Sequence, residues 1–377
     1  MAVIKSKTFT LDTSFVSDYQ HSQYKALYTS NAGIVIDMAF NVTIPNGGGY
    51  TKVGKDNVLK NIRNGVVTSG HSYSQYNSMN MISDDGLLMA SVEYLGYNDT
   101  RSRIMRATDT SWDSATTEYE FMYGTTGQSS HPYNSKFSSD GTKILISDGR
   151  TTLKYMHYNG SNWIDIETGL SSQTYMTDDG LKLLMVSLNA PNVEYKVRTY
   201  QQDGTFVNET LWASIPAQST NTNNGATDIS DSYRERVFYF DETFGIIRKQ
   251  YFGKNLQVIK PGDTTVYAFE FDFYNRHISG YNFSWESLVH IKANYKGELD
   301  IITLYESDKS NLIKRTVKPN GDVLEDSVIE YINVPLLATG DDTNIEVENF
   351  AYSEATGLFA MLRNTSNNQI RLVNLKI

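Results

Sequence analysis

The stretch Met176-Thr177-Asp178-Asp179-Gly180, within SSQTYMTDDGLKLLMVS (171–187), has the pattern of a β-hairpin turn. Asp and Gly tolerate the positive φ of a tight reversal, and the threonine hydroxyl can bond backbone amides of the turn. The run after the glycine is almost wholly apolar, which is typical of a strand covered on both faces. Close relatives of the stretch are NMISDDGLLMASV (80–92) and NSKFSSDGTKILIS (134–147).

The pattern of this turn repeats along the chain. An apolar residue, Ser or Thr, two small or acidic residues and Gly precede an apolar run, with some substitutions, in seven places. These copies lie at 29–33, 82–86, 137–141, 176–180, 229–233, 293–297 and 352–357. The fifth copy is degenerate and ends on Tyr233, before the run RERVFYF. The copies are roughly 40 to 65 residues apart, a spacing typical of four-stranded repeats.

A second pattern follows the turn copies: a strand, a polar turn and another strand. It occurs in LKYMHYNGSNWIDI (153–166), YKVRTYQQDGTFVNETLW (195–212), GIIRKQYFGKNLQVI (245–259) and LIKRTVKPNGDVLEDSVIEY (312–331), and more loosely in SRIMRATDTSWDSATTEYEF (102–121). Each unit then has two hairpins, or four antiparallel strands a, b, c and d. The sequence therefore predicts an all-β fold: a seven-bladed β-propeller of four-stranded antiparallel blades, formed by residues 1–377 as one domain.

The Ser-x-Asp-Gly turn resembles the blade repeats of TolB-like and YVTN-like propellers. The resemblance implies the fold and carries little about function. The chain ends on a predicted strand c, NQIRLVNLKI (368–377), and begins with a lone strand, VIKSKTFTL (3–11). We expect residues 3–11 to supply strand d of the last blade and close the ring, which would hide two open sheet edges. A β-sandwich or solenoid with coincidental Asp-Gly turns, or six or eight blades, are the alternatives.

Composition excludes several classes of function. The chain has 377 residues, a formal net charge of −10 and no cysteine, so disulfides, zinc–thiolate sites and a thiol nucleophile are excluded. Without a basic cluster, nucleic acid is not an expected partner. The start, MAVIKSKTFTLD, lacks the apolar segment of a signal peptide, and no run is long enough to span a membrane. We expect a virion or cytoplasmic location, no membrane insertion and no cofactor.

Function is expected in the loops on the face opposite the Asp-Gly turns, because these loops differ between blades. They are rich in Tyr, Asn, Ser and His. The candidate ligand- or partner-binding residues are His71, Tyr73, Tyr76, His131, Tyr133, Thr222, Asn224, Tyr281, Trp285, Asp341 and Asp342. Such residues suit both a sugar and a protein surface. The alternative is that these are ordinary polar loops whose tyrosines pack on the blades.

An enzymatic function has weaker support. His71 and His131, at similar places in neighbouring blades, could share a metal or act in acid–base chemistry. Loop residues such as Asp148 and Arg150, or Asp341 and Asp342, could form a carboxylate pair or a calcium site. The Asp-box of propeller sialidases, the P-loop, the G-x-S-x-G elbow and the dinucleotide fingerprint are all absent. The sequence therefore assigns no catalytic residue and no metal ligand.

The composition, with 26 Tyr, 26 Gly and no Cys, resembles that of bacteriophage virion proteins. This resemblance implies a structural or interaction protein of a tail, fibre or nozzle, in contact with other virion proteins or with the host surface. The alternatives are a carbohydrate-active enzyme (a glycoside hydrolase or lyase), a glycan-binding propeller, and a bacterial scaffold or sensor. The expected partners are protein subunits of an assembly or a host-surface glycan or receptor.

Overall fold

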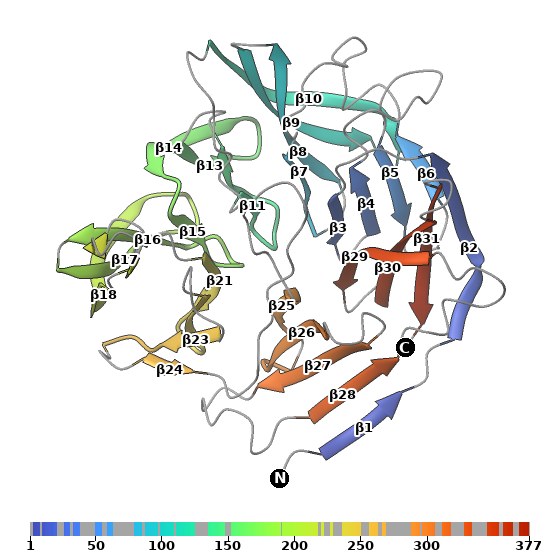
Figure 1. The fold of residues 1–377 in the computed structure, drawn as a ribbon. Coiled ribbons are helices and arrows are strands. Elements are labelled where there is room, and N and C mark those ends of the chain that lie inside the picture. Colours follow the sequence, from blue (N-terminus) through green and yellow to red (C-terminus); the bar gives the residue numbers. More distant parts are fainter. Residues whose placement is uncertain are drawn as a thin grey trace. The chain divides into compact units, whose positions relative to one another are not determined.

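The structure is a computed structural model, and every element in its described residues is a β-strand (Figure 1). It describes residues 3–7, 10–20, 26–30, 33–37, 50–54, 59–62, 79–84, 87–96, 99–108, 111–124, 135–147, 152–189, 191–217, 220–221, 227–228, 236–249, 256–262, 266–268, 288–294, 296–305, 311–317, 328–333, 345–353, 357–364 and 369–376. Within these ranges, no helix has the length and apolar character needed to cross a bilayer.

The chain divides into two compact units. Unit 1 is Met1–Thr8, Gln173–Thr177 and Leu181–Pro335, and unit 2 is Phe9–Ser172, Asp178–Gly180 and Leu336–Ile377. Apart from the N-terminal strands β1 (Val3–Lys7) and β2 (Thr10–Gln20), which join sheets of later strands, the strands of each sheet are antiparallel and follow one another in sequence order. This order is what successive hairpins produce, since a two-hairpin repeat needs no crossover connection.

Unit 2 contains four sheets of four strands. The first has β3 (Ala26–Ser30), β4 (Gly33–Asp37), β5 (Tyr50–Gly54) and β6 (Leu59–Ile62). The second has β7 (Met79–Ile82), β8 (Leu88–Gly96), β9 (Asp99–Thr108) and β10 (Ser111–Gly124). The third has β11 (Lys136–Phe137), β12 (Lys143–Ser147), β13 (Thr152–Tyr158) and β14 (Trp163–Ser171). The fourth has β29 (Ile345–Ser353), β30 (Gly357–Asn364), β31 (Gln369–Lys376) and β2 (Thr10–Gln20).

Unit 1 contains two sheets of four strands, one of five and one small pair. The first has β15 (Thr174–Met176), β16 (Lys182–Asn189), β17 (Asn192–Tyr200) and β18 (Phe206–Pro216). The second has β21 (Arg236–Asp241), β22 (Gly245–Lys249), β23 (Leu256–Ile259) and β24 (Val266–Ala268). The third has β25 (Leu288–Ala293), β26 (Leu299–Tyr305), β27 (Asn311–Val317), β28 (Val328–Asn333) and β1 (Val3–Lys7). The pair is β19 (Thr220–Asn221) and β20 (Thr227–Asp228). The predicted four-stranded antiparallel sheets are thus confirmed.

The predicted N-terminal closing strand needs a correction. Residues 3–7 form β1, which pairs in parallel with β28 and becomes the fifth strand of that sheet. The strand that completes the last sheet is β2, which pairs antiparallel with β31 from Thr10↔Lys376 to Gln20↔Gln369. The prediction was wrong about residues 3–7, although β31 is the third strand as expected. Residues 3–7 and 10–20 both have the alternating pattern of a strand, and the local sequence does not determine which of them pairs with β31.

The fifth turn copy was also misplaced. Residues 229–233 lie outside the described residues, but the run after them, β21, is the first strand of its sheet and not the second. The turn that follows β21 is Asp241–Gly245, where the Asp241 carboxylate accepts the Phe244 N–H at 2.6 Å. The segment 245–259 therefore supplies the second and third strands, β22 and β23. The true turn escaped detection because Phe244 occupies a position where a small residue was expected.

The hydroxyl group of the repeated turn binds backbone as predicted. Ser83, Ser138 and Thr177 each accept a hydrogen bond at the hydroxyl from the N–H five residues later, at 2.9, 2.9 and 3.1 Å. The backbone N–H of each also donates to the carbonyl of that later residue, at 2.9, 2.9 and 3.0 Å. The three turns therefore share one closed six-residue geometry, which explains why the sequence pattern recurs.

The turn glycine has a second role besides its backbone conformation. A Cβ on Gly180, where φ is +71°, would lie 2.9 Å from Cβ of Ser138 and 3.0 Å from Cβ of Lys143. Gly141 lies in the same way next to Ser83, with 3.8 Å from its would-be Cβ to the serine Cβ. Each of these glycines therefore packs on the serine of the preceding turn copy, and at Gly180 a side chain would push the two turns apart. The repeated turn therefore closes a hairpin and also packs against the preceding turn copy.

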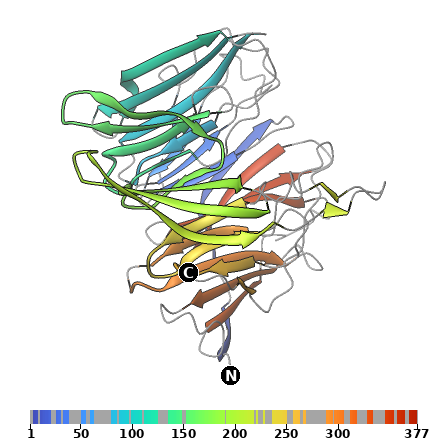
Figure 2. The ribbon, with the colours of Figure 1, turned by 90° about the vertical axis from the view of Figure 1, so that its left-hand side faces the viewer.

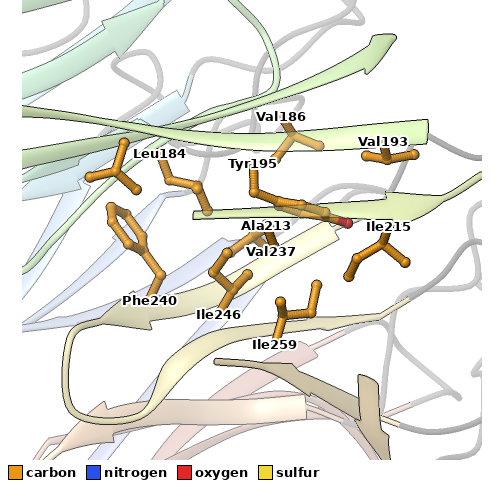
Figure 3. Packing of buried hydrophobic residues seen from close by; sticks show 11 residues of the cluster. Leu184, Val186, Val193, Tyr195, Ala213, Ile215, Val237, Phe240, Ile246 and Ile259 are labelled. Atoms are coloured by element: carbon orange, nitrogen blue, oxygen red, sulfur yellow. The ribbon is translucent and has the colours of Figure 1, made fainter. Parts of the chain in front are cut away.

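The core lies between neighbouring sheets of each unit. In unit 1, apolar side chains of β16, β17 and β18 face those of β21, β22 and β23 (Figure 3). This cluster consists of Leu184, Val186, Val193, Tyr195, Val197, Ala213, Ile215, Val237, Phe240, Ile246 and Ile259. In unit 2, the corresponding cluster is Leu88, Ala90, Ile104, Phe137, Ile144, Ile146, Met156 and Trp163. The long strands of the first unit 1 sheet run side by side in Figure 2.

Candidate functional site

The loop residues that the sequence singles out have no described position. His71, Tyr73, Tyr76, His131, Tyr133, Thr222, Asn224, Tyr281, Trp285, Asp341 and Asp342 all lie outside the described residues. The same holds for the alternative pair Asp148 and Arg150. These assignments therefore stay predictions. The chemistry that the structure does place lies in the strands and turns.

The acidic turn 178–180 is engaged in structural contacts. Asp178 forms an ion pair with Lys136, and its carbonyl accepts the Ser139 N–H at 2.6 Å. The Tyr155 hydroxyl donates to the Gly180 carbonyl at 2.7 Å. Burial, followed by the nearby carboxylates of Asp179 and Asp140, raises the pKa of Tyr155 above its usual value. The phenol is therefore neutral at physiological pH and serves as a hydrogen-bond donor to the turn.

The richest polar cluster that the structure describes lies among β9, β10, β13 and β14, and we call it the β10–β14 cluster. It consists of Arg106, Glu118, Tyr119, Phe121, Lys154, Tyr158, Trp163 and Asp165. Strands β10 and β14 are the last strands of two successive sheets, so the cluster joins these sheets within unit 2.

One half of the β10–β14 cluster is centred on Lys154. Its ammonium group donates to Asp165 at 2.8 Å and lies 4.6 Å from the Phe121 ring centroid. The Tyr119 hydroxyl donates to the same carboxylate at 3.2 Å. Only 9% of the Lys154 side chain is exposed, so both the ion pair and the cation–π contact act in a partly desolvated place.

The protonation states of this half follow from its geometry. Burial alone would lower the pKa of Lys154, but the hydrogen bonds to Asp165 and Tyr119 outweigh it and raise the pKa. Burial, then the charge of Asp165, raises the pKa of Tyr119. At neutral pH the lysine is therefore an ammonium and the tyrosine a phenol. Neither is available as a general base, because both hold their protons.

The other half of the cluster is centred on the Glu118 carboxylate. Arg106 donates to it through Nε and, at 3.3 Å, through Nη2, and Trp163 donates its indole N–H at 2.9 Å. The Arg106 guanidinium lies 5.1 Å from the Tyr158 ring centroid, and the Tyr158 and Trp163 centroids are 5.4 Å apart. Both carboxylates of the cluster thus have basic partners inside it, and the arrangement holds the two sheets together.

Sequence reasoning missed this cluster, although a signal was present. Lys154 interrupts the apolar run LKYMHY, and Glu118 and Trp163 lie on strands that the second pattern had identified. A charged residue inside a buried run indicates a partner on a neighbouring strand. Asp165 is such a partner, on the next strand of the same sheet, but the contacts of Lys154 with Phe121 and of Glu118 with Trp163 depend on packing between sheets, which the local pattern does not contain. Among the residues with described side chains, no group of three or more His, Asp or Glu is placed to hold a metal ion.

The chain was compared with known proteins. No protein-family model matches it, and no curated protein sequence does. Among solved structures, it is similar to the WD40 repeats of RRP9, with 9% identity, a TM-score of 0.49 and coverage of 98% of this chain and 100% of the other. It is also similar to TolB from Acinetobacter baumannii, with 11% identity, a TM-score of 0.36 and coverage of 93% and 79%.

A third neighbour is a prolyl endopeptidase, with 11% identity and a TM-score of 0.46. The match covers 96% of this chain and 50% of the endopeptidase, so this chain spans about half the length of that protein. The likeness to these three structures concerns the fold alone.

Proposed function

We propose that the sheets of four or five strands are the blades of one closed, seven-bladed β-propeller formed by residues 1–377. Two observations support the proposal. The stacked turns at Ser83, Ser138 and Gly180 repeat one geometry from sheet to sheet. In addition, β2 from the N-terminal region completes the sheet that contains β31 from the C-terminal region. Such strand sharing between chain ends removes open edges from a ring.

Small-angle X-ray scattering tests this closure. A compact 377-residue domain has an expected radius of gyration of about 21 Å. We expect a value close to this figure and a single compact shape in solution. Since an open chain of two independently moving units is more extended, a clearly larger radius would contradict the one-domain, closed-ring proposal.

We further propose that the protein is a non-catalytic structural and interaction module. The observation that carries this proposal is how the repeated turns are used: the Ser138 hydroxyl closes its own hairpin, while Gly180 and the backbone carbonyl of Asp178 contact the turn that contains Ser138. The repeat thus builds a rigid scaffold, and the loops that do not repeat, such as those with Tyr73, Tyr133 and Trp285, are left as the partner-binding surface. Tyrosine suits this role because it gives contact area at low entropic cost.

The assembly we propose for this module is a bacteriophage virion, in its tail, fibre or nozzle. The support is compositional: many Tyr and Gly, no Cys, and loops rich in Asn and Ser. Mass spectrometry of purified phage particles from the organism that encodes this chain tests the proposal. We expect the protein in fixed stoichiometry with the other particle proteins. Its presence in infected-cell lysate but absence from particles would contradict the virion role.

The same loop residues also favour a second candidate, a glycan-binding or glycan-cleaving propeller. A glycan array combined with a reducing-sugar assay separates these functions. For the proposed protein-binding module, we expect no release of reducing ends and no selective glycan signal. A selective signal that is lost on replacing Tyr73, Tyr76 and Tyr133 by Ala would establish a glycan binder. Release of reducing ends by the purified protein would establish the enzyme.

A further inference from the structure

The loop between β13 and β14 contains an Asn-Gly pair, Asn159-Gly160 (Figure 1). The sequence has five such pairs, at 46–47, 64–65, 159–160, 224–225 and 320–321, and the structure describes the third of them. In an Asn-Gly pair, the backbone nitrogen of the glycine can attack the side-chain carbonyl carbon of the asparagine, because no Cβ of the glycine hinders the approach. The loop therefore contains the two groups that spontaneous deamidation needs.

The pair is open to solvent. Asn159, Gly160 and the two residues that follow them are all exposed. Gly160 has a φ of +94°, and no described atom lies within 4 Å of the position that a Cβ would occupy. Water and hydroxide therefore reach both reacting groups.

Three hydrogen bonds hold Asn159 in the closed turn. Its Oδ1 accepts the Ser161 N–H at 3.0 Å and the Asn162 N–H at 2.8 Å. Its own N–H donates to the Asn162 carbonyl at 3.1 Å. Attack by the Gly160 nitrogen requires rotation about the Cα–Cβ and Cα–C bonds of Asn159, and the three hydrogen bonds restrain both rotations. The turn must therefore open before the reaction proceeds.

We propose that Asn159 is a deamidation site that the folded β13–β14 hairpin restrains. The Gly160 nitrogen loses its proton to hydroxide and bonds to Cγ of Asn159, and the side-chain nitrogen takes a proton from water and leaves as ammonia. Water then opens the resulting succinimide at either carbonyl, which gives aspartate or isoaspartate at position 159. Each product carries one more negative charge than asparagine. The proposal goes beyond the partner-binding role and does not depend on it.

The two products have different consequences for the β10–β14 cluster. An aspartate at position 159 accepts the same two N–H groups, now in charge-assisted hydrogen bonds. Isoaspartate adds one carbon to the backbone of the loop that connects Tyr158 with its register partner Trp163. The longer loop is expected to displace the start of β14, which carries Trp163 and Asp165. Isoaspartate therefore weakens the cluster, while aspartate leaves it intact.

Peptide mass spectrometry tests the restraint. The folded protein and the same protein unfolded in guanidinium chloride are incubated at one mildly alkaline pH and then digested briefly with trypsin. The tryptic peptide 155–182 contains Asn159, Asn162 and no other asparagine. We expect deamidation at Asn159 to be about tenfold or more slower in the folded protein, because two hydrogen bonds of ordinary net strength correspond to a factor of this size.

Asn162 is the internal control in the same peptide. It precedes Trp163, whose bulk hinders attack by the backbone nitrogen, so we expect it to react much more slowly than Asn159 in the unfolded protein. Equal rates at Asn159 in the folded and unfolded protein would overturn the restraint. Absence of any reaction at Asn159 in the unfolded protein would overturn the site itself.

Two variants test the hydrogen bonds within the folded protein. Ser161→Pro removes one N–H donor to Asn159 Oδ1, whereas the matched control Ser161→Ala retains it. We expect deamidation at Asn159 to be about fivefold faster in Ser161→Pro and unchanged in Ser161→Ala. The wild-type rate in both variants would contradict the proposed restraint. Circular dichroism confirms that each variant is folded.

The consequence for the cluster is measured on the products. Anion exchange separates the aged protein by its added charge, and mass spectrometry distinguishes the isoaspartate fraction from the aspartate fraction. We expect the isoaspartate fraction to unfold at lower denaturant concentration than the wild type, and the aspartate fraction to unfold with the wild type. Equal midpoints for both fractions would show that the loop length does not affect the position of β14.

Discussion

Replacement of Gly245 by alanine is expected to lower the free energy of unfolding by about 3 kcal/mol. Gly245 begins β22 with a φ of +80°, a conformation that costs an L-residue roughly 1–2 kcal/mol. An added Cβ would also lie 2.5 Å from the carbonyl oxygen and 3.2 Å from the carbonyl carbon of Ile259. Ile259 lies on β23, where it is the register partner of Ile246 on β22. The atoms that the added Cβ would meet therefore belong to backbone fixed by the sheet, and not to a side chain that could move. Overpacking of this kind typically costs a further 1–3 kcal/mol.

Urea unfolding followed by tryptophan fluorescence measures this loss. The matched control is Gly262→Ala in the same unit, where φ is +73° and nothing lies within 4 Å of the would-be Cβ. The control isolates the conformational cost, so we expect it to lose only about 1–2 kcal/mol. Equal losses of unfolding free energy in the two variants would mean that the close approach to Ile259 contributes nothing to the effect. Gly245 would then be needed for its backbone conformation alone.

The same contact shows why part of the fold was readable in the sequence and part was not. Turns at 137–141 and 176–180 were found because Ser or Thr, Asp and Gly act locally, through bonds spanning six residues. The turn at 241–245 depends on Gly245, which has no room for a side chain because Ile259 lies against it. Ile259 is 14 residues away, so a local sequence pattern does not include this contact. Local chemistry was thus predictable, while packing between strands was not.

The prediction of strand partners at the chain ends was wrong for a related reason. Residues 3–7 and 10–20 both have strand character, and the sequence does not say which of them pairs with β28 and which with β31. Pairing is a long-range property, decided by competition for edges. For the site, the sequence identified loop residues such as His71 and Tyr133, which the described part of the chain does not include. It passed over Glu118 and Lys154: their ion-pair partners lie on the adjacent strands of their own sheets, but the contacts with Trp163 and Phe121 come from the neighbouring sheet.

Replacement of Trp163 by alanine is expected to cost about 4 kcal/mol, the largest effect of a single substitution in the β10–β14 cluster. Trp163 exposes 5% of its surface and packs in the core of unit 2 with Phe137, at 6.2 Å between ring centroids. Removing a buried tryptophan side chain typically costs 3–5 kcal/mol through lost burial and the cavity left behind. The change also takes one donor from Glu118. Denaturant unfolding of the variant, with circular dichroism as the probe, measures the loss.

The contribution of the indole N–H can be separated from that of packing. Trp163→Phe keeps an aromatic ring against Phe137 and Tyr158 but removes the donor to Glu118, so we expect a loss of about 2 kcal/mol. A double-mutant cycle with Glu118→Ala, which removes the acceptor, then isolates the hydrogen bond, with an expected coupling of about 1–2 kcal/mol. Strict additivity would show that Trp163 acts by packing alone. The cluster would then join the two sheets through its rings, and the carboxylate of Glu118 would serve only to neutralise Arg106, whose guanidinium stacks on Tyr158.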